Sequence, residues 1–275
     1  MKLSLGYSPC PNDTFIFYAL AHHKLAPELH FEVELEDVEG LNQWAKSGKL
    51  DVSKISYHAY FHLTEDYVML DAGGALGNGV GPLIVTKEKL NSLSGKRVAI
   101  PGGLTTANLL LRLSQPDDII IETLRYDKIM PAVAAGEIDA GLIIHESRFT
   151  YPDYGLKKYL DVGEWWEEST GQLLPLGGIM AKRSLGKPLL DQINDALKAS
   201  LDYSYENRAE AQPYIAAHSQ EMSEDVMQKH IDLYVNTYSY DLGEKGKAAV
   251  RALYEHGRAR GFLPEIKKGL FLEEI

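Results

Sequence analysis

The sequence is poor in cysteine and contains no long apolar run. Its single cysteine, Cys10, excludes an internal disulfide. No Cys/His pattern typical of zinc sites is present and the nine histidines are scattered, so we predict no metal site. No apolar run approaches the roughly 20 residues that a membrane-spanning helix requires, so we predict no membrane partner.

Positive charge is also scarce. The chain has 28 Lys and Arg residues against 39 Asp and Glu residues, which gives a formal net charge of −11. Nucleic acids and anionic lipids bind basic surfaces, so both are disfavoured as partners. The same field repels anions, and a small acidic substrate therefore needs local donors such as helix N-termini, Lys or Arg.

The beginning of the chain, residues 1–10, superficially resembles a lipoprotein leader. Its apolar part is far shorter than the roughly 7 to 15 residues of the apolar region of a signal peptide. We therefore expect a mature, cytoplasmic protein.

The composition is that of an ordinary globular protein, and the order of its elements repeats. With 275 residues the chain exceeds a typical domain of roughly 100 to 150 residues, so two domains are expected. A strand, turn and helix begin at Leu3, and the same order restarts at Arg97. The motif Gly48-Lys49-Leu50-Asp51-Val52, a helix end that leads into a strand, recurs as Gly136-Glu137-Ile138-Asp139-Ala140. The pattern predicts an α/β fold made of two similar units.

Two glycine-rich segments mark the expected crossings between these units. Residues 73–82 lack the Gly-Lys-Ser/Thr ending of a phosphate loop and the third glycine of a dinucleotide fingerprint, so we interpret them as a flexible crossing. A second crossing is expected near residues 176–179. We assign residues 1–86 and 178–275 to a larger, discontinuous first domain and residues 87–177 to a second. The last third of the chain is predicted to be helical packing without chemistry.

The main candidate for proton transfer is His145. It follows the predicted strand 140–144 at the position that Tyr57 holds in the first unit, so Ser56, Tyr57 and His145 are expected around one cleft at the carboxyl ends of the strands. Histidine exchanges protons near neutral pH, and Glu146 or another carboxylate can orient it. A hydrogen-bonded structural histidine is an equal alternative.

Two predicted helix starts offer binding groups for an anion. Ser8 and Asn12 lie in the turn before the first helix, and Thr105, Thr106 and Ala107 begin a helix in the second unit. Backbone N–H groups at helix starts favour negative charge. Simple helix capping explains the same residue types and stays open.

Two basic residues are further candidates for an acidic ligand. Lys54 and Ser56 flank Ile55 on one predicted strand, so the two share a face. Lys54 can neutralise an anion there, although a solvated surface lysine is the simpler interpretation. Arg148 can clamp a substrate carboxylate, but a pair with Glu146 or a surface acid is favoured.

Two other segments are candidates for a functional role, and we interpret both as structural. Cys10 has no histidine near it in the sequence, which favours a structural thiol over a nucleophile. The segment Trp165-Trp166-Glu167-Glu168 is typical of an aromatic lid or of the edge of an amphipathic helix, and packing is favoured.

Four motifs together resemble the 1,4-dihydroxy-6-naphthoate synthases of the futalosine route to menaquinone. They are residues 8–15 (Ser-Pro-Cys-Pro-Asn-Asp-Thr-Phe), 79–82 (Gly-Val-Gly-Pro), 143–151 (Ile-Ile-His-Glu-Ser-Arg-Phe-Thr-Tyr) and 165–168 (Trp-Trp-Glu-Glu). The resemblance implies a two-lobed fold similar to the type-2 periplasmic binding proteins. It also implies a cofactor-free lyase that cleaves cyclic dehypoxanthinyl futalosine, a small acidic substrate.

The resemblance also implies roles for particular residues. The family's proton-abstracting base falls on His145, and its substrate contacts fall on Lys54, Ile55, Ser56, Thr105, Thr106 and Ala107. The segment 171–175 departs from the family pattern, because Gln and Leu stand where a second proline is expected, which bears on the hinge or a lid.

Two other functions remain as alternatives. They are a chorismate dehydratase of the same pathway and a non-catalytic small-molecule binding protein, because fold does not decide function. A homodimer is compatible with the sequence, which does not reveal the oligomeric state.

Overall fold

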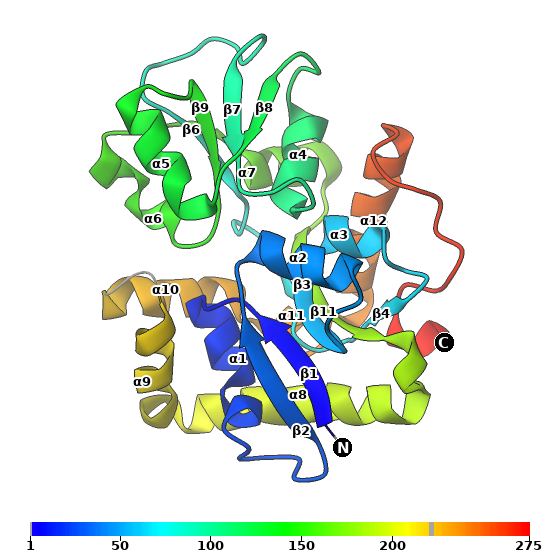
Figure 1. Cartoon of the computed structure of the whole chain (residues 1–275). Helices are drawn as coiled ribbons and strands as arrows, with labels where there is room; N and C mark the ends of the chain where they lie inside the picture. Colours follow the sequence, from blue (N-terminus) through cyan, green and yellow to red (C-terminus); the bar gives the residue numbers. More distant parts are fainter. Residues whose placement is uncertain (1, 220–222) are drawn as a thin grey trace.

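The strands of the chain form two separate sheets, one above the other in Figure 1. The computed structural model describes residues 2–219 and 223–275. The first sheet contains β1 (Lys2–Tyr7), β2 (His30–Leu35), β3 (Val52–Ser56), β4 (Tyr67–Met69), β5 (Ala75–Gly77) and β11 (Leu174–Lys182). The second sheet contains β6 (Leu83–Thr86), β7 (Arg97–Ile100), β8 (Ile120–Thr123), β9 (Ala140–Ile143) and β10 (Lys157–Asp161).

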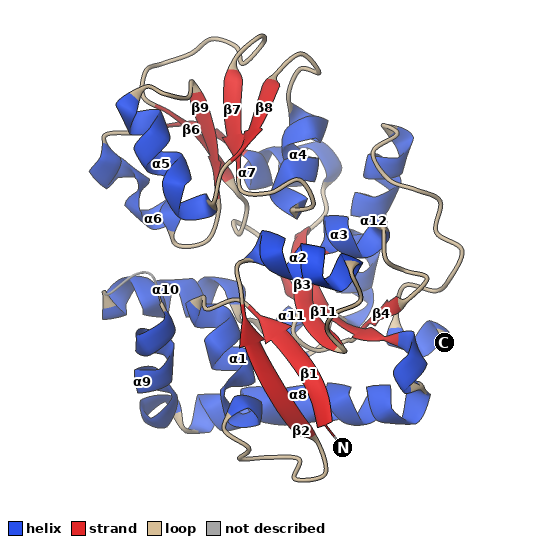
Figure 2. Cartoon of the chain, in the orientation of Figure 1, coloured by secondary structure: helices blue, strands red, loops and turns tan. Residues whose placement is uncertain are grey.

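Helices flank both sheets (Figure 2). The α-helices are α1 (Pro11–Ala21), α2 (Val38–Lys46), α3 (Tyr57–Phe61), α4 (Thr106–Ser114), α5 (Tyr126–Ala135), α6 (Ser147–Thr150), α7 (Val162–Thr170), α8 (Lys187–Glu206), α9 (Arg208–His218), α10 (Glu224–Tyr234), α11 (Thr237–Tyr240) and α12 (Gly243–Ala259). Short 3-10 helices are η1 (Tyr151–Tyr154), η2 (Arg183–Leu185) and η3 (Leu272–Glu274).

The two sheets share one strand order. The first runs β2-β1-β3-β11 and the second runs β8-β7-β9-β6. In both, the first three strands are parallel and the fourth is antiparallel to the third. The prediction of two similar α/β units is therefore confirmed.

The repeated glycine–aspartate motif performs the same task in each unit. Gly48 after α2 and Gly136 after α5 have φ values of 70° and 79°, the left-handed conformation that glycine adopts at helix ends. Three residues later, Asp51 accepts a hydrogen bond from the backbone N–H of Ser4 at 3.0 Å, and Asp139 accepts one from Arg97 at 2.9 Å. Each aspartate ties the end of its helix to the first strand of its unit.

The first crossing lies within the expected segment 73–82, but both domain boundaries were placed a few residues too late. We placed residues 83–86 in the first domain, but β6 pairs with β9 and β10 in the second sheet. We placed the return at residue 178, but all of β11 from Leu174 onward pairs in the first sheet. The crossings therefore occupy residues 78–82, between β5 and β6, and residues 171–173, between α7 and β11.

The C-terminal helices cover the first unit, in agreement with the prediction that the last third of the chain is helical packing. Helix α1 packs against α8, α9 and α10. Their apolar side chains form one core with β1, including Leu5, Phe17, Leu197 and Ile231. No helix in residues 2–219 or 223–275 combines the length and the apolar character needed to cross a membrane.

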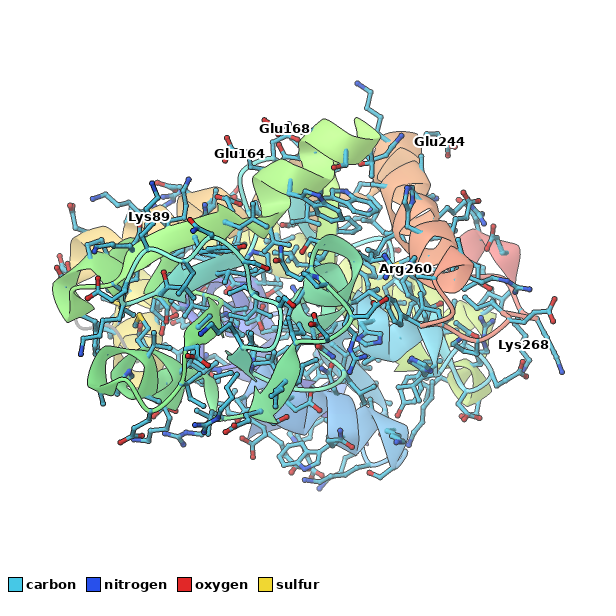
Figure 3. The ribbon with its side chains drawn as sticks, turned by 90° about the horizontal axis from the view of Figure 1, so that it is seen from above. Lys89, Glu164, Glu168, Glu244, Arg260 and Lys268 are labelled. Carbon is cyan, nitrogen blue, oxygen red and sulfur yellow. The ribbon has the colours of Figure 1, made fainter. Side chains whose placement is uncertain are left out.

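The Trp-Trp-Glu-Glu segment packs as predicted. Trp166 on α7 is fully buried, and its Nε1 donates a hydrogen bond to the Leu173 carbonyl at 3.1 Å. Glu164 and Glu168 of the same helix project outward in Figure 3. Helix α7 is therefore amphipathic, and its buried tryptophan fastens it to the start of β11.

Candidate active site

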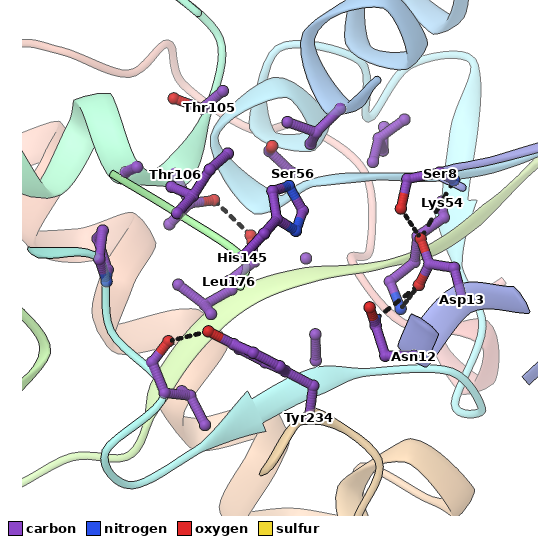
Figure 4. Close-up of a pocket in the computed structure, with 18 of the residues that line it drawn as sticks. Ser8, Asn12, Asp13, Lys54, Ser56, Thr105, Thr106, His145, Leu176 and Tyr234 are labelled. Atoms are coloured by element: carbon purple, nitrogen blue, oxygen red, sulfur yellow. Dashed lines mark hydrogen bonds and ion pairs between the residues drawn. The ribbon is translucent and has the colours of Figure 1, made fainter. Parts of the chain in front are cut away.

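A cavity lies between the two units (Figure 4). It encloses about 710 Å³ of space, part of which is open solvent. Its walls come from the turn between β1 and α1, from β3, from the start of α4, from the end of β9 and from α10. The ends of strands from both units thus meet at one site, as expected for open α/β sheets.

Most of the predicted site residues line this cavity. They are Ser8, Asn12, Lys54, Ile55, Ser56, Thr105, Thr106, Ala107 and His145. Tyr57 does not line it, because the chain turns into α3 at this residue and buries its ring completely. The expectation that Tyr57 faces the cleft is therefore wrong.

Lys54 is buried at the cavity wall and is paired with a carboxylate. Its Nζ lies 3.3 Å from Asp13 Oδ1 and donates to the Gly73 carbonyl at 2.7 Å. The alternative of a solvated surface lysine is wrong, because only 7% of Lys54 is exposed. Because Asp13 already balances its charge, Lys54 does not give the cavity a free positive charge.

Asp13 organises the turn that contains two predicted residues. Its Oδ2 accepts hydrogen bonds from the Oγ of Ser8 at 2.7 Å and from the backbone N–H of Ser8 at 3.2 Å. Its Oδ1 accepts one from the Nδ2 of Asn12 at 2.8 Å. Ser8 and Asn12 are thus bound to Asp13, and the N-cap residue of α1 is Cys10, which makes no side-chain capping bond.

The start of α4 presents backbone donors to the cavity. Thr105 is its N-cap, and the Thr105 Oγ1 accepts from the backbone N–H of Asn108 at 3.2 Å. Thr106 Oγ1 donates to the Leu176 carbonyl at 2.6 Å. The N–H groups of the first helical turn lack intrahelical partners, so Thr106 and Ala107 offer theirs to an anion. The capping role of Thr105 is therefore confirmed, and the anion site at this helix start stays a prediction.

Ser56 is oriented by one buried asparagine. Its backbone N–H donates to Asn42 Oδ1 at 3.0 Å, and its Oγ accepts from Asn42 Nδ2 at 3.1 Å. Because the Oγ acts as acceptor toward Asn42, its own proton remains free to be donated to a ligand.

His145 directly follows β9 in an uncommon backbone conformation. Its φ is 57°, which is rare for residues other than glycine and often accompanies functional sites. Its Nδ1 lies 3.3 Å from Cys10 Sγ, and the edge of its ring meets the ring of Tyr126 with 5.6 Å between centroids. His145 of the second unit therefore contacts Cys10 of the first unit, while Tyr126 of its own unit packs against its ring.

Cys10 is a protonated thiol in these surroundings. Burial and the neighbouring carboxylates of Glu146 and Asp13 raise the pKa of the Cys10 thiol well above its usual value. A thiol, unlike a thiolate, is a poor nucleophile. The interpretation of Cys10 as a structural thiol fits this burial, but its contact with His145 was not visible in the sequence.

Arg148 lies outside the cavity. Its Nη1 donates to the carbonyls of Gly79 and Gly81 at 2.6 and 2.9 Å, and its Nη2 lies 3.4 Å from Asp161. Its guanidinium therefore fastens the first crossing, and the expectation of a clamp on the substrate carboxylate finds no support in this geometry. An acid is its partner, as the favoured alternative stated, although that acid is Asp161.

Two cavity residues on α10 escaped the sequence analysis. His230 and Tyr234 line the cavity from a helix to which no chemistry was assigned. His230 is an isolated histidine in an amphipathic pattern, and such a residue is indistinguishable from core packing in a single sequence. Only its placement beside His145 distinguishes it.

One trio of potential metal ligands exists in the described part of the chain. Cys10, His145 and Glu146 each place one ligand atom within 4.8 Å of the other two. Thiolate, imidazole and carboxylate are the ligand types that suit Zn²⁺. In the metal-free site burial raises the pKa of the Cys10 thiol, so a metal ion that binds there has to displace its proton. The absence of a metal requirement stays a prediction.

The two matched sheets with a cavity between them define a periplasmic-binding-protein-like fold. The alkanesulfonate-binding protein SsuA from Xanthomonas axonopodis shares this fold with a TM-score of 0.72 and 19% identity, covering 96% of this chain and 94% of that chain. A solved protein from Archaeoglobus fulgidus is 39% identical with a TM-score of 0.91, covering 95% of this chain and 98% of that one. The fold expected from the resemblance is confirmed.

The family model described as menaquinone biosynthesis matches residues 3–259, so the chain belongs to this family. A Thermus thermophilus protein named 1,4-dihydroxy-6-naphtoate synthase is 50% identical, over 98% of this chain and 99% of its own length. A Streptomyces coelicolor protein of the same name is 45% identical, over 96% and 95%. The chain is therefore an enzyme of menaquinone biosynthesis, and neither the dehydratase nor the binding-protein alternative is favoured.

Proposed function

We propose that this enzyme is a 1,4-dihydroxy-6-naphthoate synthase. It acts as a lyase on cyclic dehypoxanthinyl futalosine and releases the naphthoate and a sugar-derived fragment. The names of both curated relatives support this assignment over nearly the full chain. Aromatisation of the released naphthalenediol helps to drive the cleavage.

The position of His145 carries the proposed mechanism. Elimination or retro-aldol opening of the ring-fused sugar needs a base and stabilisation of a developing oxyanion. His145 lines the cavity, and its Nδ1 faces Cys10. When Nδ1 carries the proton and points it at the sulfur, Nε2 is a free base for the substrate proton.

The substrate carboxylate is proposed to bind at the start of α4. The N–H groups of Thr106 and Ala107 and the hydroxyl of Ser56 lie in the same cavity. These neutral donors can bind an anion without a positively charged side chain. No such side chain is needed from Lys54, because its charge is already neutralised by Asp13. Lys54, Ser8 and Asn12, which meet at Asp13, are proposed to line the substrate pocket together with Ile55.

The proposal extends to partners and location. With a net charge of −11, the enzyme is expected to bind neither nucleic acid nor membrane and to work in the cytoplasm. Cell fractionation tests the location, and analytical ultracentrifugation tests whether the enzyme is a homodimer.

The decisive experiment follows product release by mass spectrometry. Purified, metal-stripped protein and its His145→Ala variant are incubated with cyclic dehypoxanthinyl futalosine. Naphthoate from the wild type alone supports a lyase that depends on His145. If the wild type binds the compound but releases no product, the result favours the alternative of a non-catalytic binding protein. If it consumes chorismate, the result favours the chorismate dehydratase.

A further inference from the structure

A second histidine lies in the cavity wall beside His145. His230 on α10 is 1% exposed and lines the cavity. Its ring is stacked nearly parallel to the ring of His145, with 6.2 Å between centroids and 14° between planes. The two imidazoles come from different units and meet at one site.

A chain of hydrogen bonds determines which nitrogen of His230 carries the proton. The Asp13 carboxylate only accepts hydrogen bonds, so Asn12 turns its Nδ2 toward Asp13 Oδ1, at 2.8 Å. Asn12 Oδ1 then faces His230 Nε2, also at 2.8 Å. An amide oxygen accepts, so His230 Nε2 must donate.

This tautomer leaves His230 Nδ1 as an acceptor. Nδ1 is buried and has no hydrogen-bond partner within residues 2–219 and 223–275. Burial and the neighbouring His145 lower the pKa of His230 well below its usual value, so a second proton does not fill the lone pair. Buried acceptors in proteins are normally paired. Because the His230 side chain lines the cavity, a bound ligand can supply the missing donor.

We propose that His230 Nδ1 accepts a hydrogen bond from a hydroxyl group of the bound substrate. This inference rests on the proposed function, whose substrate carries hydroxyls on its sugar-derived part. Asp13 and Asn12 act through His230, because they fix its tautomer and hence what it recognises. His230 thereby selects a polyhydroxylated ligand and holds it beside His145.

The competing explanation is that His230 serves only to hold Asn12 in place. Two amide substitutions separate these roles, because the amide of Asn reaches the position of imidazole Nδ1 and that of Gln reaches the position of Nε2. His230→Asn keeps an acceptor at the Nδ1 position and loses the contact with Asn12. His230→Gln keeps the contact with Asn12 and loses the Nδ1 acceptor.

The ordering of these two variants tests the inference. We expect kcat/KM of His230→Gln to be about tenfold lower than that of His230→Asn, with thermal unfolding recorded for both. Equal kcat/KM values in the two variants, or a higher value in His230→Gln, overturn the substrate contact. Turnover by the wild type supports the proposed function in either case.

A spectroscopic measurement keeps the inference decidable if the wild type shows no turnover. In ¹⁵N-histidine-labelled protein, His230 is expected as the neutral tautomer with its proton on Nε2, and added cyclic dehypoxanthinyl futalosine should shift its Nδ1 resonance. A proton on Nδ1, or no shift with this compound, overturns the inference. Absence of wild-type turnover overturns the proposed function independently.

Discussion

Cys10 Sγ and His145 Nδ1 lie 3.3 Å apart although 135 positions separate them in the chain. The pair joins the first unit to the second at the proposed base. Because Cys10 is a buried thiol with a raised pKa, its sulfur is a neutral, weak acceptor beside Nδ1.

Removal of this sulfur should weaken the base without removing it. In Cys10→Ala the ring of His145 loses its partner at Nδ1, so the productive tautomer is less populated. We expect kcat to fall about fivefold, as for loss of one ordinary hydrogen bond, and Cys10→Ser to restore part of it. Steady-state kinetics of both variants check this, and unchanged kcat in Cys10→Ala contradicts the orienting role.

Removal of the base itself should be far more severe. His145→Ala is expected to lower kcat by about a hundredfold or more, as loss of a general base does. Its affinity for 1,4-dihydroxy-6-naphthoate, measured by titration calorimetry, should stay within about threefold of the wild type, because the substitution leaves the proposed carboxylate site at the start of α4 unchanged. Near-normal turnover excludes His145 as the base.

The buried pair of Lys54 and Asp13 should matter mainly for stability. Lys54→Met leaves the Asp13 carboxylate buried and unpaired, so we expect a loss of about 3 kcal/mol in the free energy of unfolding. The exposed pair of Lys2 and Glu32 gives a matched control, and Lys2→Met should cost less than about 1 kcal/mol. Urea unfolding of both variants makes the comparison, and equal effects refute it.

Acid should destabilise the protein in part through His58. Burial lowers the pKa of His58 from 6.5 to about 4, and its Nδ1 lies 3.1 Å from the Thr105 carbonyl. Between pH 6.5 and 4 the unfolded chain binds a proton at His58 that the folded chain does not, so stability falls as the pH falls. The contribution of His58 between pH 7 and 5 is about 2 kcal/mol.

A substitution isolates this contribution. His58→Asn keeps an N–H donor near the Thr105 carbonyl but has no titratable group. We expect the loss of unfolding free energy between pH 7 and 5 to be about 2 kcal/mol smaller in this variant than in the wild type. Identical pH dependence of urea unfolding in both proteins contradicts the assignment.

Metal removal should leave turnover unchanged. Cys10, His145 and Glu146 are close enough to share an ion, whereas the proposed proton abstraction by His145 needs none. We expect protein dialysed against chelator to retain wild-type kcat, with metal content checked by elemental analysis. Lost activity that returns with Zn²⁺ would make this trio a functional metal site.

Local patterns predicted the architecture well. The strand predicted at residues 140–144 is observed as β9 (Ala140–Ile143), and the duplicated glycine–aspartate motif revealed the two units. These features depend on neighbours in the chain, which a single sequence displays. The domain boundaries were placed too late because β6 and β11 are assigned to their sheets by hydrogen bonds to distant strands.

The site was predictable where it follows strand and helix ends. His145, Ser56 and the start of α4 could be placed in one cleft by topology alone. The partners that define their chemistry could not, since Asp13 meets Lys54, Cys10 meets His145 and His230 meets Asn12 only after folding. Proximity in the sequence was also misleading, because Arg148 lies three residues after His145 but turns away from the cavity toward Gly79.

The contacts of Arg148 leave Asn78 as the link between the two units in the first crossing. Strand β5 ends at Gly77 in the first sheet, while Arg148 holds Gly79 and Gly81 to the second unit. Asn78 lines one surface hollow together with Gly171 and Gln172 of the return crossing. The two connections between the units therefore run next to each other, and Gln172 of the departure from the family pattern lies at this shared point.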